Sequence, residues 1–253
     1  MNSPVSKDSQ LLDPVAAYDR IAPVYARLAE RRRAYLAAVE RLVIAGIPPG
    51  SRSMLDVGAG DGVRAGRIAA AAGIESLTLL EPSAGMRSHC RVPATCWAMR
   101  AEELGSQEGS FDVITCLWNV LGHIFPAAVR VEVLRQFARL VRPEGAIFID
   151  LNHRYNTRHY GVPATAVRFL RDRLWPAGDQ GDVRVTWDIA GASPCATAGH
   201  VFTRREFRDL CRAAGLHIAK QFIVDYASGE LRRRSFEGNL LYVLRRLSVD
   251  GFA

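Results

Sequence analysis

The stretch Leu55-Asp56-Val57-Gly58-Ala59-Gly60-Asp61-Gly62 decides the fold, because an apolar run ends there in a glycine-rich turn. Residues 53–57 have the apolar character of a buried strand, and the alanine-rich residues 63–72 favour a helix. Glycines permit positive φ angles and the close approach of a ligand, and the following helix offers unpaired N–H groups. The sequence therefore predicts a strand, a ligand-binding turn and a helix in succession.

Two common ligand-binding turns do not fit this stretch. A dinucleotide fingerprint needs its third glycine at position 63, which is Val63. A phosphate-binding P-loop needs a lysine after its last glycine, whereas the only lysines of the chain are Lys7 and Lys220. The pattern that does fit, acid-x-Gly-x-Gly-x-Gly from Asp56 to Gly62, resembles motif I of the class I S-adenosylmethionine-dependent methyltransferases.

This resemblance implies a cofactor and a place for it. In the family, the turn passes under the methionine part of S-adenosylmethionine. The resemblance therefore implies that five residues of the turn bind the cofactor: Asp56, Gly58, Ala59, Gly60 and Gly62.

The next predicted strand, residues 76–80, stops at an acidic residue in Glu81-Pro82-Ser83. Glu81 follows the glycine turn at the ~20-residue spacing of ribose-binding acids, and its carboxylate can accept hydrogen bonds from both ribose hydroxyls. The resemblance assigns Glu81 and Pro82 to the ribose and Met86 to an apolar contact near the adenosine. A surface loop with a chance glutamate is the alternative.

Length and composition bound the kind of protein. The 253 residues suit one α/β domain, or one domain with a cap. No apolar run approaches the ~18 residues of a membrane span, and the N-terminus lacks a secretory pattern, so we expect a soluble, cytoplasmic protein. The five cysteines form no C-x-x-C pair, and neither a disulfide framework nor a metal site is predicted.

The net charge of +7 comes from 33 basic residues, all but two of which are arginine. Arginine favours planar partners such as carboxylate and phosphate, so the excess could serve an anionic substrate or nucleic acid. The clusters at 31–33, 232–234 and 245–246 lie far apart and contain few aromatic residues. Solvated surface is therefore favoured over a nucleic-acid groove.

The N-terminal region contains the pattern Tyr-Asp-x-Ile-Ala-x-x-Tyr, from Tyr18 to Tyr25. It resembles the cap of many small-molecule methyltransferases, including the quinone C-methyltransferases, in which such residues close over the cofactor. Tyr18, Tyr25 and Arg31 are accordingly expected to contact the cofactor, with Tyr18 or Arg31 at its carboxylate. The alternative is that the two tyrosines share one helix face and simply pack in the core.

The loop after the third strand departs from the family. Arg100 stands where related enzymes carry an aspartate that meets the adenine amino group. Only Ala101 and Glu102 are therefore carried over as cofactor contacts, and the adenine edge is expected to be read by the main chain.

The fourth predicted strand, residues 110–117, runs into Trp118-Asn119-Val120-Leu121-Gly122-His123. In a doubly wound sheet, ligands bind outside the carboxyl ends of the strands. The run Cys-Leu-x-Asn-x-x-x-His resembles the glycine and sarcosine N-methyltransferases and their relatives. We assign Leu117, Trp118 and Asn119 to the cofactor, Asn119 also to the substrate, and His123 to substrate binding and proton acceptance, against the alternative of a structural histidine.

The fifth predicted strand, residues 146–151, delivers a polar cluster to the same edge: Asn152, His153, Arg154 and Tyr155. The glycine N-methyltransferases carry a comparable cluster in a different order. We expect these four residues to bind substrate, and His153 is the second candidate proton acceptor.

The division of the chain follows from these elements. We expect a loose tail over 1–12, a helical cap over 13–50, the cofactor-binding core over 51–156, a substrate lid over 157–201 and the completion of the sheet over 202–253. Thr203 and Glu206 predict a capping box. The expected fold is α/β, a doubly wound, seven-stranded, mostly parallel sheet with a terminal antiparallel hairpin and a small lid.

The expected function is transfer of a methyl group from S-adenosylmethionine to a nitrogen or oxygen atom of a small polar or anionic metabolite. The partner is then a small-molecule substrate, with a homo-oligomer left open. Three alternatives remain: an RNA methyltransferase, a quinone or lipid-like C-methyltransferase, and a non-catalytic S-adenosylmethionine-binding protein. The strand end after residue 117 lacks the Asp/Asn/Ser-Pro-Pro-aromatic tetrapeptide of amino-methylating nucleic-acid enzymes.

Overall fold

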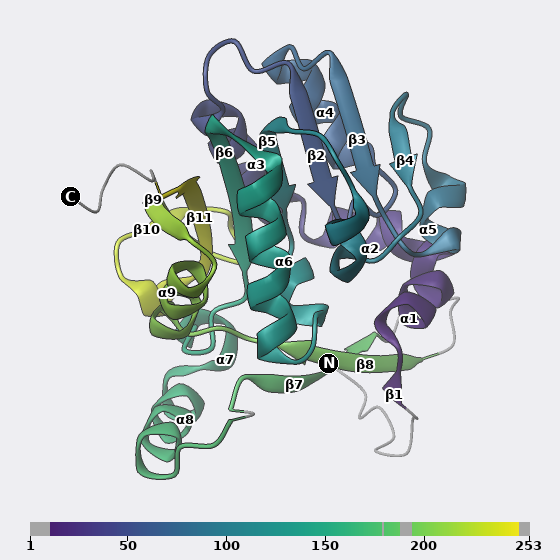
Figure 1. Cartoon of the computed structure of the whole chain (residues 1–253). Helices are drawn as coiled ribbons and strands as arrows, with labels where there is room; N and C mark the ends of the chain where they lie inside the picture. The colour runs from purple at the N-terminus through teal and green to yellow at the C-terminus, as the bar shows by residue number, and fades with distance from the viewer. Residues whose placement is uncertain (1–10, 179, 188–193, 248–253) are drawn as a thin grey trace, which may run out of the picture.

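A computed structural model describes residues 11–178, 180–187 and 194–247. Its centre is a sheet in the order β10-β9-β11-β6-β5-β2-β3-β4 (Figure 1). The parallel strands are β2 (Ser53–Val57), β3 (Ser76–Leu80), β4 (Thr95–Trp97), β5 (Phe111–Cys116) and β6 (Val141–Leu151). The antiparallel part contains β9 (Leu216–Val224), β10 (Leu231–Arg232) and β11 (Asn239–Arg246).

The predicted fold class is confirmed. Strand order and direction are those of a doubly wound sheet that ends in an antiparallel pair, β9 and β11. The two-residue β10 adds an eighth strand at the edge, which the sequence did not predict because two residues carry no alternation to recognise.

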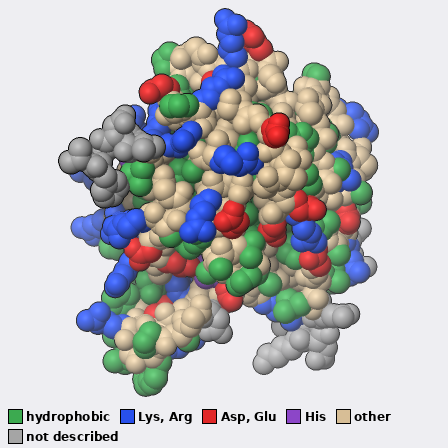
Figure 2. Space-filling view, in the orientation of Figure 1, with side chains coloured by type: hydrophobic (Ala, Val, Ile, Leu, Met, Phe, Trp, Pro, Cys, Tyr) green, Lys and Arg blue, Asp and Glu red, His purple; other side chains and the backbone are tan. Residues whose placement is uncertain are grey.

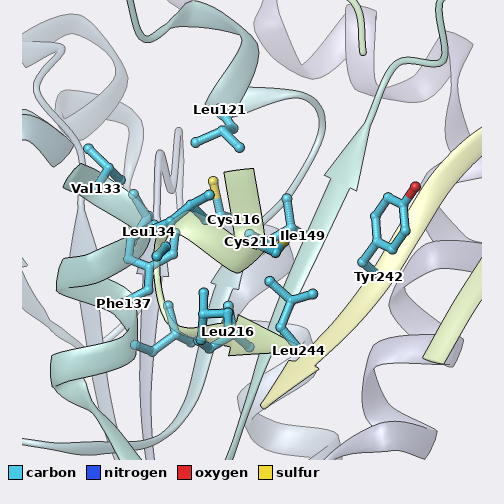
Figure 3. Close-up of a cluster of buried hydrophobic side chains, with 14 of the residues drawn as sticks. Cys116, Leu121, Val133, Leu134, Phe137, Ile149, Cys211, Leu216, Tyr242 and Leu244 are labelled. Carbon is cyan, nitrogen blue, oxygen red and sulfur yellow. The ribbon is translucent and has the colours of Figure 1, made fainter. Parts of the chain in front are cut away.

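Helices cover both faces of this sheet (Figure 1). On one face lie α6 (Ala127–Leu140) and α9 (Arg204–Ala213), and on the other lie α3 (Arg33–Gly46) and α4 (Val63–Ala72). Figure 3 shows part of the first core cluster, where Leu134 and Phe137 of α6 pack with Cys211 of α9 and Ile149 of β6. Both faces of the sheet are buried under helices, which explains why the central strands are continuous apolar runs rather than alternating apolar and polar residues.

A second sheet of three strands lies beside the first, in the order β1-β8-β7. Its members are β1 (Leu11–Leu12), β7 (Asp182–Trp187) and β8 (Cys195–His200). The tail assignment is therefore wrong for Leu11 and Leu12, which pair with β8. The carbonyl of Leu12 also accepts a hydrogen bond from Thr197 Oγ1 at 2.8 Å. Residues 1–10 of the expected tail and residues 179 and 188–193 of the expected lid lie outside the described residues.

The remaining helical elements surround the carboxyl edge of the main sheet. Before β2 come α1 (Pro14–Ile21), the 3₁₀ turn η1 (Ala22–Val24) and α2 (Tyr25–Arg31). Within the core are α5 (Ala84–His89), η2 (Ala101–Ser106) and η3 (Val120–His123). After β6 come α7 (Thr157–Tyr160) and α8 (Val162–Leu174), and η4 (Ser235–Glu237) precedes β11.

His200 ties the small sheet to the core. Its two ring nitrogens lie 2.6 Å from Asp182 on β7 and 2.6 Å from Glu206 on α9. Its carbonyl accepts a hydrogen bond from Asn119 Nδ2, at 3.1 Å. The small sheet is thus fixed against the end of β5, where the glycine turn also lies.

Candidate active site

A pocket, here called the main pocket, lies at the carboxyl ends of β2, β3 and β5, between α1 and η3. Its lining residues are Pro14, Val15, Tyr18, Tyr25, Val57, Gly58, Gly60, Arg64, Leu80, Glu81, Pro82, Arg100, Ala101, Glu102, Leu117, Trp118, Val120, His123 and Ile124. This is the edge of the sheet at which open α/β folds bind ligands.

The glycine turn forms the floor of the main pocket, and only glycine fits there. Gly58 and Gly60 have φ values of +70° and +63°. A Cβ at Gly58 would fall 2.5 Å from Val120 Cγ2, and one at Gly60 would fall 3.2 Å from Met86 Cε. Gly62 is also left-handed, but its added Cβ would meet Leu79 and Cys90, so this glycine packs away from the pocket.

Glu81 anchors the turn from the end of β3. The Gly60 N–H donates to Oε2 at 2.8 Å, and the Ser83 N–H donates to Oε1 at 2.9 Å. Burial raises the pKa of Glu81 to about 7 despite these two hydrogen bonds. Each carboxylate oxygen keeps lone-pair capacity for a hydroxyl donor in the pocket.

Asp56 and Arg64 supply buried polar atoms that lack partners. Thr115 Oγ1 donates to Asp56 Oδ1 at 2.5 Å, whereas Asp56 Oδ2 is buried with no hydrogen-bond partner among the described residues. Burial raises the pKa of Asp56, and the charge of Arg64 opposes this effect. Arg64 Nε is likewise buried without a described partner. One acceptor and one cationic donor left open beside the same turn suit the ammonium and carboxylate of an amino acid.

His123 lies at the opposite wall, in a group of aromatic rings. The ring centroids of Tyr18 and His123 are 5.6 Å apart, and those of Tyr18 and Trp187 are 5.4 Å apart. His123 Nδ1 lies 3.0 Å from the carbonyl oxygen of Ala198, so we assign the proton to Nδ1, since a carbonyl can only accept. Nε2 is then the acceptor, 3.4 Å from the Tyr18 hydroxyl, and burial lowers the pKa of His123 so that the ring is neutral near pH 7.

Trp118 and Asn119 adopt left-handed backbone conformations, with φ values of 63° and 62°. Such angles are unusual for residues other than glycine and cluster at functional sites. Asp150 holds both: its Oδ2 accepts from the Trp118 N–H and its carbonyl from the Asn119 N–H, each at 3.0 Å. Tyr35 also donates to Asp150. The bend turns the Trp118 ring toward Tyr25, 5.7 Å away, and buries the side chain of Asn119.

The polar cluster after β6 lies away from the main pocket. Arg154 is 3% exposed and forms two hydrogen bonds with Asp172 of α8, at 2.5 and 2.7 Å, and Tyr155 also donates to Asp172 at 2.9 Å. These contacts attach α8 to the core. Asn152 Oδ1 accepts from Asn239 Nδ2 at 2.8 Å. His153 is buried, which lowers its pKa to about 4, and its Nδ1 has no described partner.

The structure thus brings together part of the expected site. The expected residues that line the main pocket are Tyr18, Tyr25, Gly58, Gly60, Glu81, Pro82, Ala101, Glu102, Leu117, Trp118 and His123. The expected residues that do not line it are Arg31, Asp56, Ala59, Gly62, Met86, Asn119, Asn152, His153, Arg154 and Tyr155.

The positions of Arg31 and Met86 in the fold explain why neither residue lines the main pocket. Arg31 is exposed at the end of α2, and Met86 is buried beneath Gly60. Arg64 is the main residue that the sequence analysis missed, because one arginine on a helix of an arginine-rich chain resembles solvated surface. Arg100 lines the pocket, but its guanidinium forms an ion pair with Asp13, the residue that caps α1, at 2.7 Å.

The described residues offer neither a grouped set of metal ligands nor a helix that could span a membrane. No three of their His, Cys, Asp or Glu side chains are grouped as metal ligands would be. None of the described helices has the length and apolar character needed to cross a membrane.

Comparisons with known proteins agree on one family. A family model described as a methyltransferase domain matches residues 27–221. No curated protein matches the chain. Among solved structures, the CcbJ methyltransferase from Streptomyces caelestis superposes with a TM-score of 0.67 at 16% identity, covering 91% of this chain and 98% of that one.

Two other solved structures are similar. The sugar N-methyltransferase KedS8 from a Streptoalloteichus species has a TM-score of 0.60 at 15% identity and covers 98% of each chain. The N-methyltransferase NodS from Bradyrhizobium japonicum, in complex with S-adenosylhomocysteine, has a TM-score of 0.61 at 12% identity, covering 94% of this chain and 100% of that one. At these identities the likeness shows the fold.

Proposed function

The chain belongs to the methyltransferase-domain family and is an S-adenosylmethionine-dependent enzyme, and from this premise we propose that it methylates a nitrogen or oxygen atom of a small polar or anionic metabolite. The observation that carries the proposal is the gathering of Glu81, Arg64 and the glycine turn in one pocket with His123. Family membership also favours an enzyme over a non-catalytic binding protein.

Residues in and beside the main pocket fit the cofactor. Glu81 would accept hydrogen bonds from the ribose hydroxyls, and the open Oδ2 of Asp56 would accept one from the ammonium group. Arg64 would bind the carboxylate, the role first given to Tyr18 or Arg31. Tyr18 lies against His123 instead, and Arg31 lies outside the pocket.

Methyl transfer requires that the acceptor atom be aligned with the methyl group and that water be excluded. When bound, the cofactor supplies a methyl group that is electrophilic because it is attached to a sulfonium. Direct displacement then requires the acceptor atom to be held in line and water to be excluded. The rings of Tyr18 and Trp118 line the main pocket, and Trp187 packs against Tyr18.

His123 would serve as the proton acceptor. Its neutral Nε2 would take the proton that the acceptor nitrogen or oxygen loses. The carbonyl of Ala198 holds Nδ1 protonated, which leaves the acceptor lone pair on Nε2, where the Tyr18 hydroxyl is its partner in this structure. His153 is a weaker candidate because it does not line the main pocket.

Calorimetry with S-adenosylhomocysteine tests the proposal. We expect saturable binding by the wild type and about tenfold weaker binding by Glu81→Ala, since a hydrogen bond to a charged group is worth ~1.5 kcal/mol or more. Glu108→Ala, which removes an exposed glutamate, is the matched control and should leave the affinity unchanged. Equal affinities of wild type and Glu81→Ala would refute the ribose assignment.

An RNA acceptor is the alternative that the net charge favours. Two arginines from the basic clusters are, however, bound within the fold: Arg232 to Glu230 and Asp225, and Arg245 to the carbonyls of Glu144 and Gly145. On the face seen in Figure 2, arginine side chains are interspersed with acidic and hydrophobic ones. Methyl transfer measured with mixed tRNA and rRNA, against a pool of metabolites and quinones, separates these acceptors.

A further inference from the structure

We infer that a second pocket of this chain binds an oxyanion, the carboxylate or phosphate group of the methyl acceptor. This inference rests on the proposed function. The second pocket, here called the arginine pocket, has a volume of about 300 Å³. The residues used in the argument are Arg32, Asn156, Arg158, His159, Asp225 and Tyr226, all of which line it.

The arginine pocket lies on the same edge of the sheet as the main pocket. β6 and β9 are both antiparallel to β11, so they run in the same direction. Asn156 follows β6, and Asp225 and Tyr226 follow β9, so these residues extend from the carboxyl edge, and Arg32 joins α2 to α3. An acceptor held here would therefore lie on the ligand-binding side of the fold.

Tyr226 connects the two pockets. Its hydroxyl accepts a hydrogen bond from Trp118 Nε1 at 3.4 Å, and Trp118 lines the main pocket. The Tyr226 ring also packs against Tyr35, with centroids 4.9 Å apart, and against His159, at 5.4 Å. The side chains of Tyr226 and Trp118 thus link the arginine pocket to the main pocket.

The charges of the arginine pocket leave a positive excess. Arg158 is paired with Asp225, whose carboxylate also accepts from the N–H groups of Ala227 and Ser228 at 2.9 Å. Arg32 lies over the Tyr226 ring, 4.4 Å from its centroid, and forms no ion pair with any residue that the structure describes. Asp225 is therefore fully engaged, and the charge of Arg32 is available to a ligand.

A second arginine, Arg168 of α8, lies near the arginine pocket without lining it, and its guanidinium donates to the carbonyl of Arg154 at 2.8 Å. Arg168 lies 4.3 Å from the centroid of Tyr160, and within the described ranges it has no acidic partner. Burial lowers the pKa of His159, and the charges of Arg32 and Arg168 lower it further. His159 is therefore a neutral imidazole between two cations, which suits the neighbourhood of an anion.

Two groups of the arginine pocket can donate a hydrogen bond to a ligand. The Tyr226 hydroxyl accepts from Trp118 and keeps its own proton to donate, and the guanidinium of Arg32 offers a fork of N–H groups. Asn156 is not free, because its amide bonds to Asn239 and to the N–H of His159, each at 3.2 Å. Donors with a net positive charge match an oxyanion and not an ammonium group.

Binding of small anions tests the arginine pocket directly. The probes are inorganic phosphate and acetate, titrated calorimetrically into the full chain with and without S-adenosylhomocysteine. We expect saturable binding of one probe, weakened about tenfold in Arg32→Gln and several-fold in Tyr226→Phe. The stronger probe indicates whether the acceptor carries a phosphate or a carboxylate.

Arg41→Gln is the matched control, because it removes an equal charge from an exposed position of α3. The inference is overturned if neither probe binds saturably, or if Arg41→Gln weakens binding as much as Arg32→Gln does. The affinity for S-adenosylhomocysteine should be unchanged in Arg32→Gln. A wild type that fails to bind S-adenosylhomocysteine would refute the proposed function, whereas the phosphate and acetate titrations would still report on this pocket.

Discussion

The proposed ribose contact of Glu81 should make cofactor binding depend on pH. The Glu81 pKa of about 7 means that the carboxyl group loses an acceptor when the pH falls through neutrality. We expect the affinity for S-adenosylhomocysteine to decrease as the pH is lowered from 8 to 6, whereas Glu81→Gln should bind weakly and with a flat profile. Calorimetry at each pH measures both, and parallel profiles would contradict this account.

His123 should affect the rate of methyl transfer and leave cofactor affinity unchanged. Removal of a general base typically costs 10²–10⁴-fold in rate, so we expect His123→Gln to lose about two orders of magnitude or more. Incorporation of labelled methyl groups into a pool of metabolites measures the rate. His217→Gln, at an exposed position of β9, is the control. If His123 were purely structural, His123→Gln would lower stability and rate together, and thermal unfolding would detect the loss of stability.

At the residue scale, local patterns predicted the glycine turn and Glu81, and the structure places Gly58, Gly60 and Glu81 in the main pocket. Their roles depend on backbone geometry within a few residues of each. Arg64 and Arg154 could not be placed in this way. The position of Arg64 depends on which face α4 turns toward the sheet, and Arg154 is held by Asp172 of a different helix. The functional roles of all these residues stay predictions.

At the scale of elements, the capping box of α9 is confirmed. Thr203 Oγ1 accepts from the Glu206 N–H at 3.1 Å, and Glu206 accepts from the Thr203 N–H at 3.3 Å. Loss of such a cap costs about 1 kcal/mol, so Thr203→Ala should lower the free energy of unfolding by that amount. Denaturant titration measures it, with Arg205→Ala, 93% exposed, as a control expected to change little. A Thr203→Ala variant as stable as the wild type would contradict this reading.

Element boundaries were less predictable where distant segments decide them. β6 begins at Val141 rather than Ala146, because Val141 pairs with Phe111 across the sheet. A sequence read locally sees only Arg142-Pro143-Glu144-Gly145, which is typical of a turn. β1 is a strand because it pairs with β8, and the sequence of two residues cannot predict such a pairing.

For the whole molecule, Asp112 joins the amino ends of three strands. Its carboxylate accepts from the N–H groups of Arg52 and Ser53 and from Arg142, and against the effect of burial these bonds lower its pKa to about 2. A folded-state pKa below the usual value stabilises the fold above pH ~4, and this stabilisation is lost as the pH falls toward 2.

The acid stability of the chain tests this. With allowance for solvent screening, we expect Asp112→Asn to cost on the order of 1 kcal/mol at pH 7 and to be nearly neutral at pH 2. Urea titrations at the two pH values measure the difference. A cost that does not change with pH would assign the effect to packing.

The overall architecture followed from the order of predicted elements, since alternating strands and helices lead to a parallel doubly wound sheet. The place of β1 in the second sheet could not be predicted, because its partner β8 lies far later in the chain. Neither could the separation of the polar cluster after β6 from the main pocket, since this depends on where α8 docks.

The pairing of β1 with β8 has a practical consequence for labelling. Leu11 and Leu12 are followed at once by α1, which carries Tyr18 into the main pocket. An affinity tag or fluorescent protein fused directly before Leu11 would therefore lie next to the main pocket. Fusion after β11 is preferable, because that strand runs against β6 and finishes at the far rim of the sheet (Figure 1).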